Sequence, residues 1–220
     1  QTPDELIEKY GADTLRLYEM FLGPIEQSKP WDTKGISGVH NFLRKCWRLY
    51  CDTEGKCILD NTNKPHKEAL KTLHKTIKKV KEDLDRYSLN TCVSTFMIAV
   101  NEFTEQKCKS SEVMQQFLLL LAPYAPHFCE ELWEKMGYKS GTLFTADFPV
   151  FEPSHLVEDS FDYPISFNGK MRFKAKLSLS LSKEEIQAEV EGLDLTQKWL
   201  EGRMPKKVIV VPGKIVNIVI

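Results

Sequence analysis

The sequence has no long apolar run, and this absence limits the classes of protein that it can encode. Its longest apolar run, Phe117 to Ala122, is far shorter than the roughly 20 residues that span a bilayer. Residues 1 to 30 show no charged start followed by an apolar stretch, so nothing there resembles a secretion signal. We therefore expect a cytoplasmic protein that makes no contact with a membrane.

The cysteine spacing is equally restrictive. No two cysteines are spaced as C-x-x-C, so neither a zinc knuckle nor a redox dithiol is indicated. Several fall at core positions of predicted helices, where a reduced thiol serves as a small apolar side chain. We expect all of them to be reduced, as in cytosolic proteins. The six are Cys46, Cys51, Cys57, Cys92, Cys108 and Cys129.

Catalytic patterns are also missing. No Ser-His-Asp, Cys-His or paired-carboxylate arrangement stands out, and four histidines have no partner motif: His40, His66, His74 and His155. A fifth, His127, precedes Cys129, Glu130 and Glu131, which could suggest a metal site. Packing and the favourable position of carboxylates near a helix N-terminus explain that stretch better. We predict no catalytic residue and no metal ligand.

The net charge is −1, yet charges of one sign gather along the chain. Residues 64–81 hold seven lysines against one glutamate, residues 111–160 hold eight acidic side chains against two lysines, and residues 161–220 hold ten basic against seven acidic side chains. Such basic patches could serve a polyanion. A solvated helix face is the commoner explanation for any single run.

The first two thirds of the sequence has a helical period. Thr2-Pro3-Asp4-Glu5 opens a short helix that stops at Gly11, and a second helix covers about residues 12–21. Apolar residues then recur at spacings of three and four over residues 39–50, 70–84, 93–103 and 113–121, and a last helix runs from Pro126 to Gly137. We predict connecting helices and a loop over residues 1–35, then a helical bundle over 36–140.

The period changes to two after a linker at residues 141–162. Apolar and polar residues alternate from Met171 to Leu181, and Asn168-Gly169 predicts a tight hairpin with residues 163–167. A capping box at Ser182 opens a helix, a second short helix covers residues 194–201, and a hairpin turns at Pro212-Gly213. The fold class is therefore mainly α, with a small α+β (ββ-αα-ββ) domain over residues 163–220.

Four stretches carry a resemblance to a known family. Residues 10–17 (YGADTLRL) resemble the segment after the lysine-rich ATP loop of class I aminoacyl-tRNA synthetases. Residues 121–133 (LAPYAPHFCEELW) resemble the last bundle helix of the leucyl, isoleucyl and valyl branch. Residues 168–172 (NGKMR) and 211–214 (VPGK) resemble the terminal domain of bacterial-type leucyl-tRNA synthetases. The likeness covers essentially the whole chain.

The resemblance implies an anticodon-binding-type bundle from the C-terminal part of such a ligase. The HIGH and KMSKS motifs, the Rossmann domain and the editing domain would lie upstream, so this fragment alone should be inactive. For the parent protein it implies leucine-tRNA ligase activity with ATP and magnesium, whereas the fragment itself has no cofactor. The implied partners are tRNA-Leu and the upstream catalytic and editing domains, in a monomeric enzyme.

Candidate tRNA-binding residues lie in both parts of the chain. Alternation places Arg172, Lys174 and Lys176 on one face of a strand, about 7 Å apart at a rise of ~3.3 Å per residue. Four further lysines could widen this patch: Lys170, Lys206, Lys207 and Lys214. On residues alone, the wet face of a sheet explains the pattern equally well. The resemblance favours contact with the tRNA elbow.

In the bundle, Arg44, Lys45 and Arg48 lie on the polar side of the helix over residues 39–50. The resemblance turns this helix toward the inner side of the tRNA, which makes the three residues candidates for phosphate contacts. Alternatively they cover the apolar stripe or pair with the acidic helix over residues 126–136. The four tryptophans are interpreted as core anchors rather than as base-stacking platforms: Trp31, Trp47, Trp133 and Trp199.

Two other functions stay open. A non-catalytic scaffold or partner-binding helical protein would carry the same basic faces and would bind little RNA. The corresponding part of an isoleucyl or valyl enzyme would prefer another tRNA. The absence of a cysteine-rich zinc module and of a terminal coiled coil argues against that second alternative.

Overall fold

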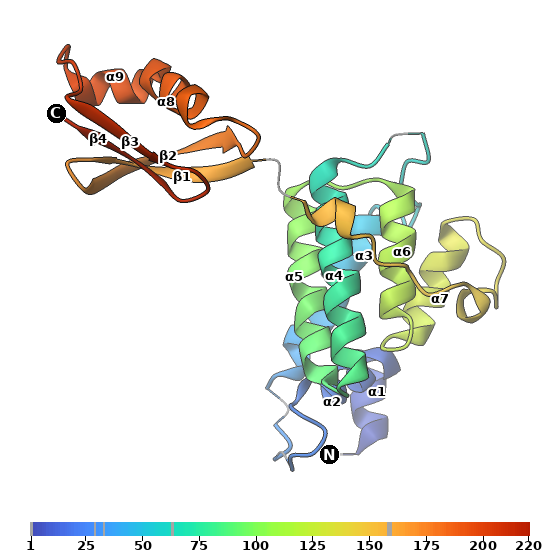
Figure 1. Cartoon of the computed structure of the whole chain (residues 1–220). Coiled ribbons are helices and arrows are strands. Elements are labelled where there is room, and N and C mark those ends of the chain that lie inside the picture. Colours follow the sequence, from blue (N-terminus) through green and yellow to red (C-terminus); the bar gives the residue numbers. More distant parts are fainter. Residues whose placement is uncertain (1, 29, 33, 63, 158–159) are drawn as a thin grey trace. The chain divides into compact units, whose positions relative to one another are not determined.

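A computed structural model describes residues 2–28, 30–32, 34–62, 64–157 and 160–220 (Figure 1). The chain divides into two compact units, Gln1–Leu156 and Val157–Ile220, which are treated separately below. No helix within the described ranges is both long and apolar enough to cross a membrane.

Unit 1 is a helical bundle. Its α-helices are α1 (Pro3–Tyr10), α2 (Ala12–Phe21), α3 (Ile36–Tyr50), α4 (Lys67–Asp85), α5 (Leu89–Glu105), α6 (Ser111–Leu121) and α7 (Pro126–Lys135). Two 3₁₀ turns follow, η1 (Leu143–Thr145) and η2 (Pro153–Leu156). Figure 1 shows α3 to α6 side by side, with α1 and α2 at one end of the bundle.

The predicted apolar stripes form the core of unit 1. Val39 and Cys46 of α3, Ile77 of α4 and Val100 of α5 are all fully buried. Helix α6 brings Phe117 into edge-to-face contact with aromatic rings of α5, which is a favoured geometry for aromatic pairs. The bundle therefore buries one stripe from each helix, as the helical period predicted.

The segments before and after the predicted bundle also belong to unit 1. Helix α2 packs against α3, α5 and α7, and Arg16 of α2 donates two hydrogen bonds to the carbonyl oxygen of Pro123, at 3.0 and 3.1 Å. After the helices, η1 packs on α7 and η2 packs on α4. Most of the predicted linker at residues 141–162 is thus part of this unit, and the boundary between the units lies at Leu156/Val157.

Unit 2 has the predicted ββ-αα-ββ order. Its elements are β1 (Ser160–Phe167), β2 (Lys170–Ser178), α8 (Lys183–Gly192), α9 (Asp194–Leu200), β3 (Lys207–Val211) and β4 (Ile215–Val219). The strands form one sheet in the order β2-β1-β4-β3, in which β1 and β4 are parallel and the other neighbours antiparallel. Figure 1 shows α8 and α9 on one face of this sheet, where Ile165, Ile186 and Val216 are buried.

Turn chemistry fixes the ends of these elements. Asn168 and Gly169 both have positive φ, at 48° and 79°, as a two-residue hairpin turn requires. Ser182 forms the predicted capping box with Glu185. Strand β2 ends at Ser178, earlier than the alternation to Leu181 predicted, because Ser178 and Ser180 hydrogen-bond one another and the backbone turns there.

Candidate nucleic-acid interface

Helix α3 presents two arginines to solvent. Arg44 and Arg48 are exposed and lie one turn apart, whereas Val39, Leu43 and Cys46 of the same helix are buried. Within the described residues, neither guanidinium has a hydrogen-bond or ion-pair partner inside the chain. Arg44 lines three neighbouring hollows and Arg48 two of them. The N–H groups of both guanidiniums are therefore available to a ligand that occupies these hollows.

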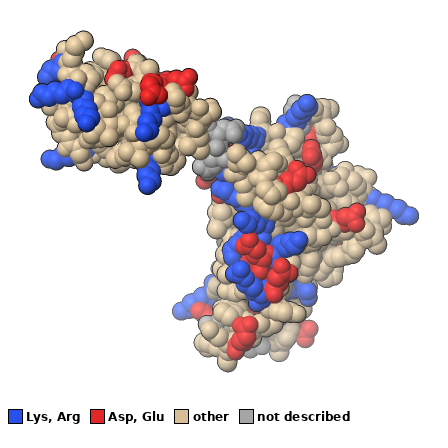
Figure 2. Space-filling view, viewed as in Figure 1, with Lys and Arg blue, Asp and Glu red and all other residues tan. Residues whose placement is uncertain are grey.

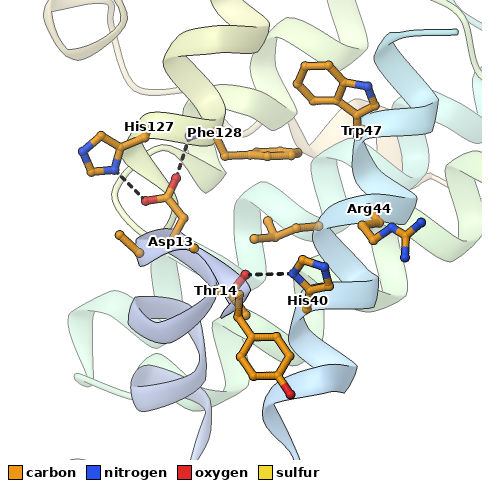
Figure 3. Close-up of a pocket in the computed structure, with 11 residues that line it drawn as sticks. Asp13, Thr14, His40, Arg44, Trp47, His127 and Phe128 are labelled. Atoms are coloured by element: carbon orange, nitrogen blue, oxygen red, sulfur yellow. Dashed lines mark hydrogen bonds and ion pairs between the residues drawn. The ribbon is translucent and has the colours of Figure 1, made fainter. Parts of the chain in front are cut away.

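The hollow between α2, α3 and α7 is the most apolar of the three. Its volume is about 520 Å³. Trp47 of α3 and Phe128 of α7 form one edge-to-face pair in its wall, with ring centroids 6.0 Å apart, and Tyr10 and His40 form another at 5.8 Å. Figure 3 shows Trp47 next to Phe128, with Arg44 on the same helix as Trp47. The hollow is thus lined by both aromatic rings and the guanidinium of Arg44.

Asp13 fixes one side of this hollow. Its buried carboxylate accepts hydrogen bonds from the backbone N–H of Phe128 at 2.6 Å and from Nδ1 of His127 at 2.9 Å (Figure 3). The acceptor lies at the N-terminus of α7, where backbone N–H groups lack partners within the helix and the dipole favours negative charge. Asp13 therefore joins α2 to α7 on this side of the hollow.

The same contact accounts for the histidine that suggested a metal site. Glu130 accepts from the backbone N–H of Gly141, Glu131 pairs with Lys135 at 3.2 Å, and Cys129 is buried. His127, Glu130 and Glu131 thus each interact with a different part of the unit. Among the described residues they do not form a group that could converge on one ion.

Lys45 differs from its two neighbours on α3. It is half-buried, and its Nζ donates to Oδ1 of Asn101 on α5 at 2.6 Å. An RNA phosphate would have to compete with this bond. The bundle site is therefore centred on Arg44 and Arg48, and the prediction for Lys45 is the weakest of the three.

In unit 2, the predicted basic row on β2 is split. Lys174 and Lys176 are exposed and alternate with Ala175 and Leu177, which face the core. The register between β1 and β2 shifts at Ile165/Ser166, so Arg172 has no Cα partner on β1. A bulge of this kind re-aims side chains.

The guanidinium of Arg172 instead lies over the ring of Trp199 on α9, 4.3 Å from its centroid. The prediction that Arg172 shares a face with Lys174 and Lys176 is therefore wrong. Nor is Trp199 a core anchor, since it is 40% exposed, and Trp31 at 43% is not one either. Trp133 is buried as predicted, and Trp47 is half-buried in the wall of the hollow.

The other four predicted lysines of unit 2 are all exposed: Lys170, Lys206, Lys207 and Lys214. Figure 2 shows basic side chains around the edge of unit 2, with acidic side chains gathered over one part of it. Helix α8 carries three exposed acidic residues: Glu184, Glu185 and Glu189. Positive charge is thus displaced from this helix toward the strands and turns.

The lysine-rich helix α4 behaves as a solvated face. Figure 2 shows lysines and acidic side chains intermingled over it. Lys79 pairs with the buried carboxylate of Asp83 at 2.6 Å, and Lys78 lies over the ring of Phe151. Lys78 and Lys79 thus interact with other side chains of the same unit. The mixture of charges agrees with a solvated helix face, the explanation preferred for this run from the sequence.

The fold also pairs two histidines that are far apart in the sequence. His74 on α4 stacks on His155 of η2 with ring centroids 4.3 Å apart and an interplanar angle of 15°. Nδ1 of His74 accepts from the backbone N–H of Glu152 at 3.2 Å, and the Glu152 carboxylate contacts Nε2 of His155 at 3.1 Å. No sequence signal predicts this pair, because η2 has no periodic pattern that would place it on α4.

This cluster is better explained as a structural contact than as a metal site. Its three possible ligand atoms lie within 4.8 Å of one another. An ion bound through two imidazole nitrogens lies in the plane of each ring, whereas these rings are stacked nearly parallel. Burial and the neighbouring His155 lower the pKa of His74, opposed by the Glu152 carboxylate. A neutral His74 can keep Nδ1 as an acceptor.

Comparison with known proteins identifies the kind of domain. Residues 66–188, more than half of the chain, match a family model described as the anticodon-binding domain of tRNA ligase. This match extends from α4 into α8, so α3 with Arg44 and Arg48 lies outside it.

Curated relatives extend the likeness over nearly the whole chain. A leucine--tRNA ligase of Christiangramia forsetii is 61% identical over 217 residues, and one of Flavobacterium johnsoniae is 55% identical over 218, each covering 99% of this chain. The chain spans only 22% of the length of either relative. A LeuRS from Agrobacterium radiobacter K84, solved in a ternary complex with tRNA and LeuAMS, matches all of this chain and 30% of its own, with a TM-score of 0.67 and 25% identity.

Proposed function

The chain belongs to the family of anticodon-binding domains of tRNA ligases, and from this premise we propose that it binds tRNA as a non-catalytic part of a leucine--tRNA ligase. Its substrate in that role is tRNA-Leu. Its task is to hold the body of the tRNA so that the acceptor end reaches a distant active site. Positioning of this kind can supply a large share of a rate enhancement without any side chain doing chemistry.

The observation that carries the proposal is the pair of uncommitted arginines on α3. Residues one helical turn apart are about 6 Å apart along the axis at ~1.5 Å per residue, so Arg44 and Arg48 can reach successive phosphates of one strand. Guanidinium groups bind phosphate with paired hydrogen bonds. The adjoining Trp47–Phe128 wall offers apolar surface that a ribose or base could cover.

Unit 2 supplies a second proposed contact surface. Lys174 and Lys176 lie on β2, at one edge of the sheet, and further exposed lysines lie at the turns and on β3, at the opposite edge. Away from the row of Lys174 and Lys176, Arg172 with Trp199 offers a cation stacked on an exposed aromatic ring. Contacts to phosphate give affinity without reading sequence. Two basic surfaces on one chain would recognise the shape of a tRNA rather than a short sequence within it.

The rest of the ligase would supply the chemistry. We expect the whole protein to bind ATP with magnesium and leucine through catalytic and editing domains outside this chain, and to work as a monomer in the cytoplasm. A chain tested alone should then show RNA binding without aminoacylation.

Filter retention of labelled tRNA tests the proposal. The purified chain is titrated with tRNA-Leu and with one unrelated tRNA, each at low and at moderate salt. Salt-sensitive binding that favours tRNA-Leu is the expected result, because released counterions make phosphate contacts salt-dependent. Preferential binding of isoleucine or valine tRNA would instead assign the chain to an isoleucyl- or valyl-tRNA synthetase. Absence of binding even at low salt would favour the scaffold alternative.

A further inference from the structure

Cys51 and Cys57 close a short turn directly after α3. They are paired as an isolated antiparallel bridge, although five residues separate them in the sequence. A pair with this spacing does not fit the C-x-x-C pattern and so gives no motif in the sequence. Both cysteines are present as free thiols.

The backbone hydrogen bonds define the type of pair. The N–H of Asp52 donates to the carbonyl of Lys56 at 3.0 Å, and the N–H of Ile58 donates to the carbonyl of Tyr50 at 2.9 Å. These bonds flank the two cysteines, which makes them a non-hydrogen-bonded pair with Cα atoms about 4.5 Å apart and side chains on the same side. Disulfides form across Cα distances of about 4.4 to 6.8 Å, so only a small adjustment separates this pair from a bond.

The turn between the cysteines is held in place by its own contacts. Oδ1 of Asp52 accepts from the backbone N–H groups of Glu54 and Lys56, at 3.0 and 2.9 Å. Gly55 has φ of 77°, which favours glycine, and its N–H donates to the carbonyl of Asp52. Because the turn is already ordered, the two thiols lie opposite one another. Forming a bond between them does not require the loss of conformational entropy that ordering a flexible loop would.

The two thiols differ in access. Cys51 is 2% exposed, and burial together with the neighbouring Cys57 raises its pKa to about 11, opposed by the Lys135 ammonium. Cys57 is half-buried and can meet a small solute from solvent. An oxidant would react first at Cys57, and Cys51 would then resolve the product.

We propose that Cys51 and Cys57 form a reversible oxidation site that closes to a disulfide in the presence of a peroxide. The Cys57 thiol loses its proton, and the thiolate attacks one oxygen of the peroxide and breaks the O–O bond; this gives a sulfenic acid and a hydroxide, which takes up the released proton and becomes water. The Cys51 thiol then loses its proton, and its thiolate attacks the Cys57 sulfur and breaks the S–O bond; the leaving hydroxide takes up that proton and becomes a second water. Two thiols lose two electrons and two protons, and one hydrogen peroxide becomes two waters. A dithiol reductant reverses the change by thiol–disulfide exchange.

The site lies beside the proposed RNA surface but does not depend on it. Cys51 and Asp52 line the same hollow as Arg44 and Arg48. The disulfide would fix the turn that forms one wall of that hollow. The other four cysteines are buried and lie outside this turn: Cys46, Cys92, Cys108 and Cys129.

Peptide mapping tests the proposal directly, because Lys56 lies between the two cysteines. The folded chain is treated with hydrogen peroxide, its remaining thiols are blocked with an alkylating reagent, and it is digested with trypsin without reduction. Cleavage after Arg48 and Lys56 places Cys51 in residues 49–56 and Cys57 in residues 57–67. The expected result is a covalently linked pair of these peptides that separates when dithiothreitol is added, with loss of both free thiols.

Three variants make the test specific. Cys51→Ser and Cys57→Ser should each abolish the linked pair, whereas Cys92→Ala, which removes a thiol from α5, should leave it intact; circular dichroism checks that each variant is folded. Sulfinic acid at Cys57 beside an alkylated Cys51 would overturn the proposal. So would a link from either cysteine to another part of the chain or to a second molecule.

Discussion

At the scale of single residues, Arg44 and Arg48 carry most of the proposed RNA contact of the bundle. We predict that the double variant Arg44→Ala/Arg48→Ala weakens tRNA binding at least tenfold. The slope of log affinity against log salt should also fall by about one for each phosphate that the variant no longer binds. Filter retention over a range of salt concentrations measures both quantities. The reason is that neither guanidinium is committed to a partner within the described chain, so its whole donor set is free for phosphate.

A charge-matched control separates contact from net charge. The double variant Lys75→Ala/Lys81→Ala removes two exposed lysines of α4 and should change affinity much less. Equal reductions for the two double variants would show that tRNA responds only to total charge, which would contradict a site on α3.

His74 gives a prediction about pH. Because the folded chain holds the pKa of His74 below its ordinary value, the unfolded chain takes up this proton first as the pH falls. The stability that His74 contributes is therefore fully present above the unfolded pKa of about 6.5 and is lost as the pH falls through it. Denaturant unfolding of unit 1 at about pH 7.5 and about pH 5.5 should show this loss.

The variant His74→Asn should reduce that loss, since an asparagine carbonyl oxygen can accept from the N–H of Glu152 but does not titrate in this range. His66→Asn, at an exposed position just before α4, is the matched control and should keep the full loss. If His74→Asn and the unmodified chain lost the same stability on acidification, groups other than His74 would be responsible for the pH dependence.

The sequence predicted which side chains of the candidate site are exposed, but not which partners they contact. The exposure of Arg44 and Arg48 follows from their positions opposite an apolar stripe. The bond from Lys45 to Asn101, the stacking of His74 on His155 and the bridge between Cys51 and Cys57 do not, because each depends on how distant segments pack or turn. A predicted helix face shows which side chains reach solvent but not which of them already have a partner.

At the scale of elements, the capping box of α8 is a local device whose energy can be measured. Ser182→Ala removes the acceptor of the Glu185 N–H and should destabilise unit 2 by about 0.5 to 2 kcal/mol. Ser180→Ala removes only the exposed hydroxyl contact with Ser178, outside the cap, and should cost less. Denaturant unfolding followed in unit 2 gives both values, and equal effects would show that the cap adds nothing.

Element boundaries were predictable where a turn residue sets them. Gly11, Asn168-Gly169 and Ser182 mark chain turns or helix starts as expected. The course of β2 was not predictable to the same degree. Its alternation is regular, yet the bulge opposite Ile165/Ser166 removes Arg172 from the basic row. Bulges depend on strand pairing, which a single strand's pattern does not specify.

At the scale of the whole chain, the two units have separate cores. Ile186→Ala removes a fully buried side chain from unit 2 and should destabilise that unit by roughly 2 to 5 kcal/mol while leaving unit 1 unchanged. Hydrogen exchange detected by mass spectrometry reports the two units separately. Protection that fell equally in α4 and α5 would show that the chain unfolds as one unit.

The order of elements followed from the sequence at this scale, since both the helical period and the ββ-αα-ββ pattern are strong. The position of the hollow between α2, α3 and α7 did not follow from the sequence, because residues far apart in the chain line it, among them Asp13 and Phe128. Residues 1–35, predicted as connecting helices and a loop, include α2, which packs against α3, α5 and α7 within unit 1.

Hydrogen exchange of the chain with and without tRNA-Leu tests the central claim, that RNA is held by α3 and by the basic surface of unit 2. We predict slower exchange in peptides covering the second half of α3 and the turn after it, and in β2 with the turn before it. The exposed side of α4 should be unchanged. Protection confined to α4, or no protection at saturating tRNA, would contradict this claim.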